Sequence, residues 1–177
     1  MRMRSLLVAA AAGLLPLAVA LPATADTTGA SAARITVRSG VLSITVRTDA
    51  GDLGSRSSSV GAATVRGSLG QVQVSDGRGA PAGSGWVASV TTTAFTSLAG
   101  PAIPASAVGY TAGPIAKVGA ATYTATDPAH LTGRTAVVTA TGITGNNTAT
   151  WTPTLTVTLP AGTPAGVYSA TITHSVA

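Results

Sequence analysis

Few side chains in this chain of 177 residues have the chemistry of a catalytic group. It contains two histidines and five acidic residues, and it has neither glutamate nor cysteine. A Ser-His-Asp triad needs its three side chains within hydrogen-bond reach, and serine is so common here that a serine near either histidine means little. No Gly-x-Ser-x-Gly sequence stands at a strand-to-helix turn. We therefore predict no catalytic residues and a protein that is not an enzyme.

The two histidines have different surroundings in the sequence. His130 follows Asp127-Pro128-Ala129, a turn sequence that predicts an exposed loop. His174 shares strand parity with Ile172, which predicts a ring directed toward the core. A zinc site needs three or four nitrogen, sulfur or carboxylate donors. Two histidines without cysteine or a His-x-His spacing do not supply them, so we expect no metal site and no cofactor.

Asp49 and Asp52 lie three residues apart in one polar stretch. Clustered aspartates in loops can bind calcium, but turn formation and capping of loop N–H groups is the favoured interpretation. A pair of carboxylates for glycoside hydrolysis is not expected, because no aspartate sits in an apolar stretch that would raise its pKa.

The two tryptophans could stack on sugar rings if exposed, or anchor a core. Trp151 shares parity with Leu155 and Val157, which favours the core, whereas Trp86 follows a Gly-rich turn and is expected nearer a rim. The ten basic residues are spread singly along the chain. Nucleic-acid binding is not expected, because aromatic platforms interleaved with arginine are absent.

The elements that must position these residues are predicted to be β-strands. Glycine and proline recur every few residues, and threonine and valine fill the gaps. Arg34–Arg38 and Leu42–Arg47 alternate polar and apolar residues on either side of Ser39-Gly40, which predicts a hairpin. A loop is expected at 48–59 and a tight turn at Asp76-Gly77-Arg78-Gly79. Further strands are predicted at 64–66, 71–75, 85–95, 105–110, 121–126, 135–141, 150–159 and 167–176.

This pattern predicts an all-β protein with a single β-sandwich of about nine or ten short, mainly antiparallel strands. The order in which the strands pair stays open.

The first 25 residues predict a cleaved secretory signal peptide. Met1-Arg2-Met3-Arg4 is basic, residues 6–21 are almost entirely Leu, Ala and Val, and Ala23-Thr24-Ala25 has the small-x-small pattern of a cleavage site. The apolar run is short for a membrane span. We expect a secreted, extracellular protein with a flexible tail at 26–33, a domain at 34–177 and no membrane span in the mature chain.

The order of segments resembles the WxL-domain family of Gram-positive cell-surface proteins, in an actinobacterial form. The likeness spans about Ile35 to Ala177. Five segments carry it: Gly40-Val41-Leu42-Ser43-Ile44, Asp52-Leu53-Gly54-Ser55, residues 72–79 (VQVSDGRG), Gly85-Trp86-Val87-Ala88-Ser89-Val90 with Thr93-Ala94-Phe95-Thr96, and residues 166–176 (GVYSATITHSV).

The family takes its name from two Trp-x-Leu motifs, and both are degenerate in this chain. The first reads Trp86-Val87-Ala88 and the second His174-Ser175-Val176. The resemblance implies a secreted β-sandwich that attaches non-covalently to the cell wall, with peptidoglycan or another wall polymer as its partner. The binding residues expected from it are Trp86, Ala88, His174 and Val176, with Asp76 and Arg78 shaping the adjacent turn.

Two other functions stay open at this point. One is a structural or assembly subunit, whose sheet edges pair with copies of itself or with a larger surface protein. The other is a hydrolase that depends on His130 or His174. The sequence ends without a Leu-Pro-x-Thr-Gly sortase signal, so retention at the wall is expected to be non-covalent.

Overall fold

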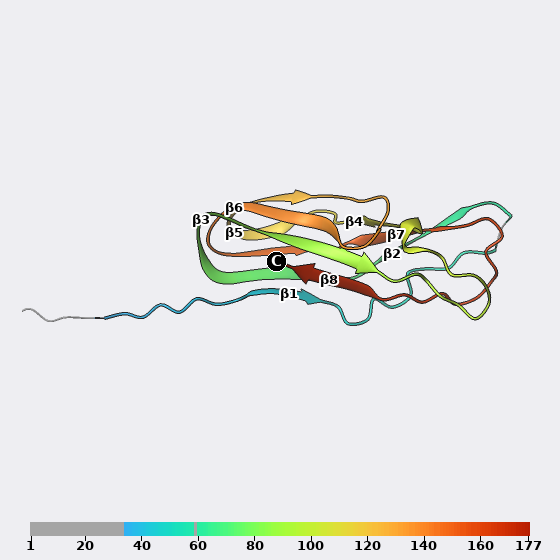
Figure 1. Cartoon of the computed structure of the whole chain (residues 1–177), viewed down its shortest axis with the longest axis horizontal. Helices are drawn as coiled ribbons and strands as arrows, with labels where there is room; N and C mark the ends of the chain where they lie inside the picture. The colour runs from blue at the N-terminus through green and yellow to red at the C-terminus, as the bar shows by residue number, and fades with distance from the viewer. Residues whose placement is uncertain (1–33, 59) are drawn as a thin grey trace, which may run out of the picture. The chain divides into compact units, whose positions relative to one another are not determined.

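The computed structural model describes residues 34–58 and 60–177, which contain eight β-strands in two antiparallel sheets (Figure 1). The predicted all-β sandwich is confirmed, but the described residues form eight strands and not nine or ten, because segments predicted as separate short strands join into the long strands at 72–92 and 135–151. The chain divides into Met1–Thr36 and Val37–Ala177, and the fold below is that of the second part. The predicted signal peptide (1–25) and tail (26–33) lie outside the described residues.

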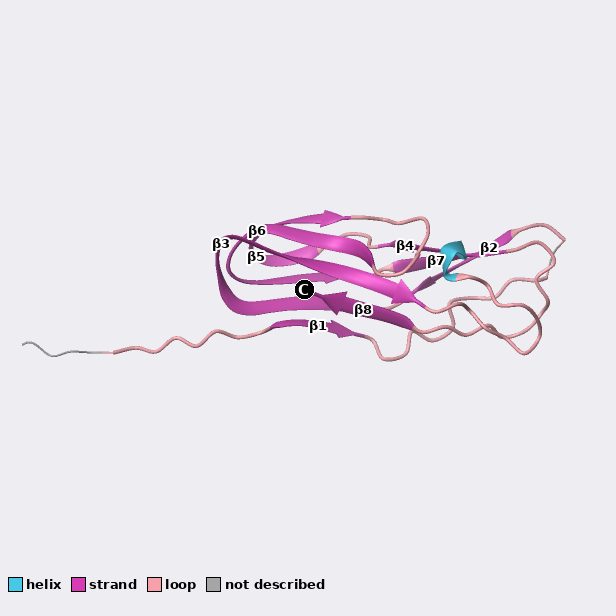
Figure 2. Ribbon diagram, viewed as in Figure 1, coloured by secondary structure: helices cyan, strands magenta, loops and turns pink. Residues whose placement is uncertain are grey.

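The larger sheet has five strands and the smaller has three. The larger runs β1-β3-β6-β5, and β8 also pairs with β3; the smaller runs β2-β7-β4. Figure 2 shows that a single 3-10 turn, η1 (Ala105–Ala107), is the one helical element among the described residues. The strands are β1 (Leu42–Val46), β2 (Ala63–Ser68), β3 (Val72–Thr92), β4 (Val108–Thr111), β5 (Ala116–Ala125), β6 (Thr135–Trp151), β7 (Thr154–Leu159) and β8 (Ile172–Val176).

The larger sheet folds over itself because its long strands bend together. β3 pairs with β6 from Val72 opposite Trp151 to Val90 opposite Thr135, with register shifts between Asp76 and Trp86. Bulges of this kind bend a strand. β1 pairs with the first part of β3 and β8 with the last part, and Figure 1 shows β3 curving back between these two regions. One continuous pair of strands therefore contributes to both layers of the sandwich.

The smaller sheet continues one of these layers. The Leu69 N–H donates to the Pro153 carbonyl (3.0 Å) at the point where β2 leads into β3 and β6 leads into β7. The core fills the space between the layers, and each large aliphatic side chain buried there contributes about 1.5–3 kcal/mol. The largest fully buried side chains are Trp151, Tyr110, Ile103, Leu131, Ile143 and Leu155.

The predicted hairpin at the start of the domain is wrong. β1 is confirmed as a strand, but its partner is β3, with Leu42 opposite Asp76. Gly40 does not turn the chain back: its N–H donates to the Gly77 carbonyl (2.8 Å), and the Gly77 N–H donates to the Val41 carbonyl (3.0 Å). The alternating pattern correctly marked a strand, but alternation carries no information about which distant strand will pair with it.

The predicted tight turn at Asp76-Gly77-Arg78-Gly79 is also wrong, because these residues lie inside β3. The segment bends without ending the strand, since β6 bends with it and the pairing resumes at Ala80 opposite Gly145. Several other predicted boundaries change. The strand expected at 105–110 begins only at Val108, after η1, and the strands expected at 121–126 and 135–141 are the longer β5 and β6. The strand expected at 150–159 is interrupted at Thr152-Pro153, where proline has no N–H to donate, and the closing strand begins only at Ile172.

Candidate functional site

Three of the predicted binding residues meet in a buried polar network inside the bend of β3. The Asp76 carboxylate accepts hydrogen bonds from the Arg78 Nε (2.9 Å), Nη2 (2.9 Å) and backbone N–H (3.1 Å). The Arg78 Nη2 also donates to the Gly85 carbonyl (3.2 Å), across the bend. The Asp76 residue is 1% exposed, and these hydrogen bonds from Arg78 hold the pKa of its carboxyl below the usual range.

Asn147 is the centre of the same network, and sequence reasoning missed it. Its Oδ1 accepts from the Trp86 Nε1 (3.1 Å) and from the Tyr123 hydroxyl (3.1 Å), and its Nδ2 donates to Asp76 Oδ2 (3.3 Å). Trp86 lies opposite Ala140 in the β3–β6 pair, and the seven residues from there to Asn147 would span about 23 Å in a straight strand. The bond therefore joins the two sides of the bend. The sequence placed Asn147 between two predicted strands, in a segment with two glycines and a second asparagine, so no sequence signal pointed to a buried asparagine there.

Ala88 and Val176 lie opposite each other in the pairing of β3 with β8. Ala88 is fully buried and Val176 is half-buried against the core. Trp86, expected near a rim, is 2% exposed and packs on Tyr123 with ring centroids 5.6 Å apart. Trp86, Ala88 and Val176 therefore pack in or against the core of the described structure.

His174 belongs to a second cluster, which joins the two sheets. The Tyr110 hydroxyl of β4 accepts a hydrogen bond from the Trp151 Nε1 (2.9 Å) and lies 3.2 Å from the His174 Nε2 of β8. A tyrosine hydroxyl both donates and accepts, so this contact fits either neutral tautomer of the His174 ring. Burial lowers the pKa of His174 to about 4 and raises the pKa of Tyr110 well above its ordinary value.

The other titratable candidates lie apart from these clusters. His130 is exposed, as predicted, with its Nδ1 2.6 Å from the Ser106 carbonyl oxygen. Asp49 and Asp52 accept hydrogen bonds from the Gly51 and Gly54 N–H groups (2.8 Å each), which confirms their predicted capping role. In the described part of the chain, no three His, Cys, Asp or Glu side chains gather as a metal-binding group.

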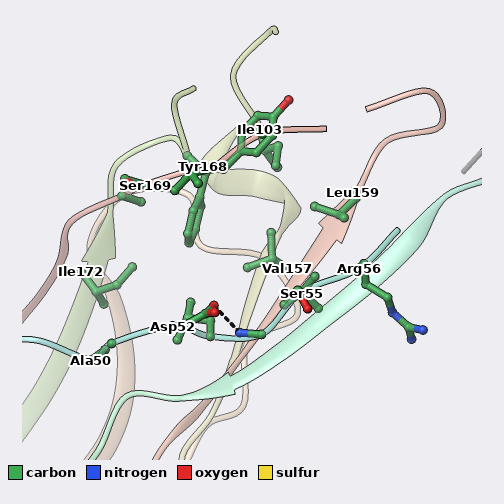
Figure 3. Close-up of a pocket in the computed structure, with 18 of the residues that line it drawn as sticks. Ala50, Asp52, Ser55, Arg56, Ile103, Val157, Leu159, Tyr168, Ser169 and Ile172 are labelled. Atoms are coloured by element: carbon green, nitrogen blue, oxygen red, sulfur yellow. Dashed lines mark hydrogen bonds between the residues drawn. The ribbon is translucent and has the colours of Figure 1, made fainter. Parts of the chain in front are cut away.

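A cleft of about 810 Å³ opens between the two layers, beyond the end of β1. Figure 3 shows it between the loop that carries Asp52, Ser55 and Arg56 and the strand that carries Val157 and Leu159. Val72, Phe95 and Ile103 are buried residues that line its floor. Its walls are half-buried apolar side chains: Leu53, Val65, Leu159, Tyr168 and Ile172.

The loop beside the cleft is held against β2. A Cβ on Gly67 of β2 would lie 2.5 Å from the Leu53 Cα, so only glycine lets the loop approach this closely. The Arg56 Nε donates to the Thr64 carbonyl (3.1 Å), and the Ser58 hydroxyl donates to the Thr163 carbonyl (3.0 Å). Of the six predicted binding residues, His174 is the one that lines the cleft.

The comparisons add no relative: neither a protein-family model, nor a curated protein, nor a solved structure matches the chain. Among the described residues, the structure contains no helix with the length and hydrophobicity of a membrane span.

Proposed function

We propose that this chain is an exported, non-catalytic β-sandwich that associates non-covalently with a polymer of the bacterial cell wall, most simply peptidoglycan. The basic, apolar and small-x-small segments at 1–25 support export. The likeness of the segments from Ile35 to Ala177 to WxL domains supports the wall as the partner.

The observation that carries a binding function is the interlayer cleft. Its volume of about 810 Å³ falls in the range of about 300–1,000 Å³ that is usual for ligand sites. Its apolar floor and walls are bordered by the charged and hydroxyl side chains of the loop at 47–58. Such a lining can bind the apolar groups of a ligand while its polar groups fix the orientation.

The distribution of titratable groups favours binding over catalysis. The His174 ring is committed to Tyr110 through Nε2, and His130 is an exposed residue in a different segment. Asp76 is committed to Arg78, and Asp49 and Asp52 each cap a loop N–H. General acid–base catalysis needs such groups held in reach of one substrate, which this distribution does not favour.

Sedimentation with purified peptidoglycan sacculi tests the proposal. The purified product of the full coding sequence is expected in the pellet at low and moderate salt, and mass spectrometry is expected to show that it begins near Asp26. Ala50→Trp places a bulky ring in the cleft, which Ala50 lines, and is expected to reduce pelleting. Ala82→Trp, at an exposed position away from the cleft, is the matched control. Protein that stays in the supernatant under all conditions contradicts wall association.

Self-assembly through strand edges is a second candidate function. β5 pairs with β6 on one side, and its Val118 is 71% exposed. Exposed edge strands are sites of pairing between chains. Ile35 and Val37, each 89% exposed, have the alternation of a strand and lie outside the strands of the two sheets. Sedimentation velocity should then show a mass that rises with concentration and falls in Val118→Lys; a constant monomer mass contradicts assembly.

A further inference from the structure

Four charged side chains from a single loop border the interlayer cleft. Arg47, Asp49, Asp52 and Arg56 all line it, and all are exposed. Asp76 and Arg78 form the only ion pair among the described residues. The four loop charges are therefore not neutralised by one another or by other described side chains.

The loop geometry uses only part of each charged group. Asp49 and Asp52 cap their N–H groups through Oδ1, which leaves Oδ2 of each without a hydrogen bond from a described residue. The Arg56 Nε donates to the Thr64 carbonyl, which leaves the terminal guanidinium nitrogens without a hydrogen bond to a described residue. Figure 3 shows Asp52 and Arg56 along one segment of chain at the edge of the cleft, with the Arg56 guanidinium directed away from Val157 and Leu159. The cleft thus presents two anionic and two cationic groups beside an apolar surface.

The aromatic residues around the cleft do not provide a surface for a sugar ring. Phe95 is 7% exposed. Tyr168 is half-buried, and its hydroxyl donates to the Pro164 carbonyl (3.1 Å). A glycan stacks on an open aromatic face, and in the described chain the aromatic side chains are all buried or half-buried. The exposed groups at the cleft are charges and hydroxyls.

On the basis of the proposed wall association, we propose that the cleft binds the peptide part of the wall polymer and not its glycan. The ligand class is a short, extended peptide with small apolar side chains, a free side-chain ammonium and free carboxylates. The ammonium pairs with Asp49 or Asp52 and a carboxylate pairs with Arg47, whose planar guanidinium can donate two parallel hydrogen bonds. The small side chains pack on Leu53, Leu159 and Ile172.

Titration calorimetry with the purified product of the full coding sequence tests this assignment. The probe is the synthetic stem peptide L-alanyl-γ-D-glutamyl-L-lysyl-D-alanyl-D-alanine, compared with the same peptide acetylated on its lysine and with a tetrasaccharide of N-acetylglucosamine. The stem peptide is expected to bind, and binding should weaken at high salt. Acetylation should weaken binding about two- to fivefold, as expected for one exposed ion pair. The tetrasaccharide should give no binding heat.

Substitutions then assign the charges. Asp52→Asn keeps an oxygen for the Gly54 N–H but removes the charge, so it should weaken binding of the stem peptide about two- to fivefold and reduce the effect of lysine acetylation. Arg47→Gln should weaken binding similarly. Arg66→Gln, an exposed charge on β2 that does not line the cleft, should bind as the unmodified chain does.

The outcomes separate the two proposals. If the protein pellets with sacculi but gives no heat with the stem peptide, or binds the tetrasaccharide instead, the peptide assignment is overturned and wall association stands. If Asp52→Asn and Arg47→Gln both bind like the parent chain, the cleft is not the peptide site. If the peptide binds but the protein never pellets with sacculi, the peptide site stands and wall association is overturned.

Discussion

Acidification below neutral pH is expected to destabilise this protein through His174. The ring is buried, and its Nε2 lies 3.2 Å from the Tyr110 hydroxyl, whose oxygen accepts a hydrogen bond from Trp151. Burial lowers the pKa of His174 from 6.5 to about 4. An unfolded chain therefore takes up this proton more readily than the folded one, and protonation favours unfolding.

The pH window follows from these two values. The contribution of His174 is fully present above about pH 6.5, declines as pH falls, and is lost below about pH 4. One pKa unit corresponds to about 1.36 kcal/mol, so the difference predicts a loss of about 3 kcal/mol of unfolding free energy between pH 7 and pH 4. Asp76 is not part of this change, because its carboxyl has a lowered pKa and stays ionised until lower pH.

Urea denaturation followed by tryptophan fluorescence at pH 7, 6, 5 and 4 measures this loss. His174→Gln removes the titrating group while its amide can still form a hydrogen bond with the Tyr110 hydroxyl, so this variant should lose much less stability over the same range. His130→Gln, at an exposed imidazole, is the control and should keep the parent pH dependence. Equal losses in the parent chain and in His174→Gln would refute the role given to this ring.

Three further changes test the bend of β3. Asn147→Ala leaves the Trp86, Tyr123 and Asp76 groups without their shared partner and should cost about 3 kcal/mol by urea denaturation, against about 1 kcal/mol for the exposed Asn146→Ala. Arg78→Gln removes the two guanidinium hydrogen bonds, which are the largest cause of the lowered pKa of Asp76. Since that carboxylate stabilises the fold above its unfolded pKa of 3.8 and loses this effect as pH falls, the acid-unfolding midpoint followed by circular dichroism should move to higher pH. Gly85→Ala places a Cβ 2.6 Å from the Ala140 carbonyl oxygen and should lower stability by about 2 kcal/mol. Gly61→Ala, whose added Cβ would meet no atom within 4 Å, should change the urea midpoint little.

The sequence located most strands but not their partners. Leu42–Val46 was identified by its alternation, yet it pairs with β3 and not with the preceding residues. The Asp76-to-Gly79 segment has the residue types of a turn, and it does change the direction of the chain. It remains within a strand because β6 bends beside it. A bend that depends on the pairing of two strands distant in the chain cannot be recognised from the sequence of either strand alone.

For the candidate site too, the sequence predicted local features but not the contacts between distant segments. The sequence indicated that Asp49 and Asp52 would cap a polar loop, and they do. It gave no indication that this loop would border an interlayer cleft with Leu159 and Ile172, which lie more than 100 residues away in the chain.

The local pattern of side chains determined the class of this protein, because alternation, branched residues and frequent Gly and Pro act through neighbouring residues only. The tertiary structure decided which charges are paired, which aromatic residues are buried and where a cleft opens. These properties depend on contacts such as Trp86 with Asn147 and Tyr110 with His174, between residues that are brought together only when the layers pack.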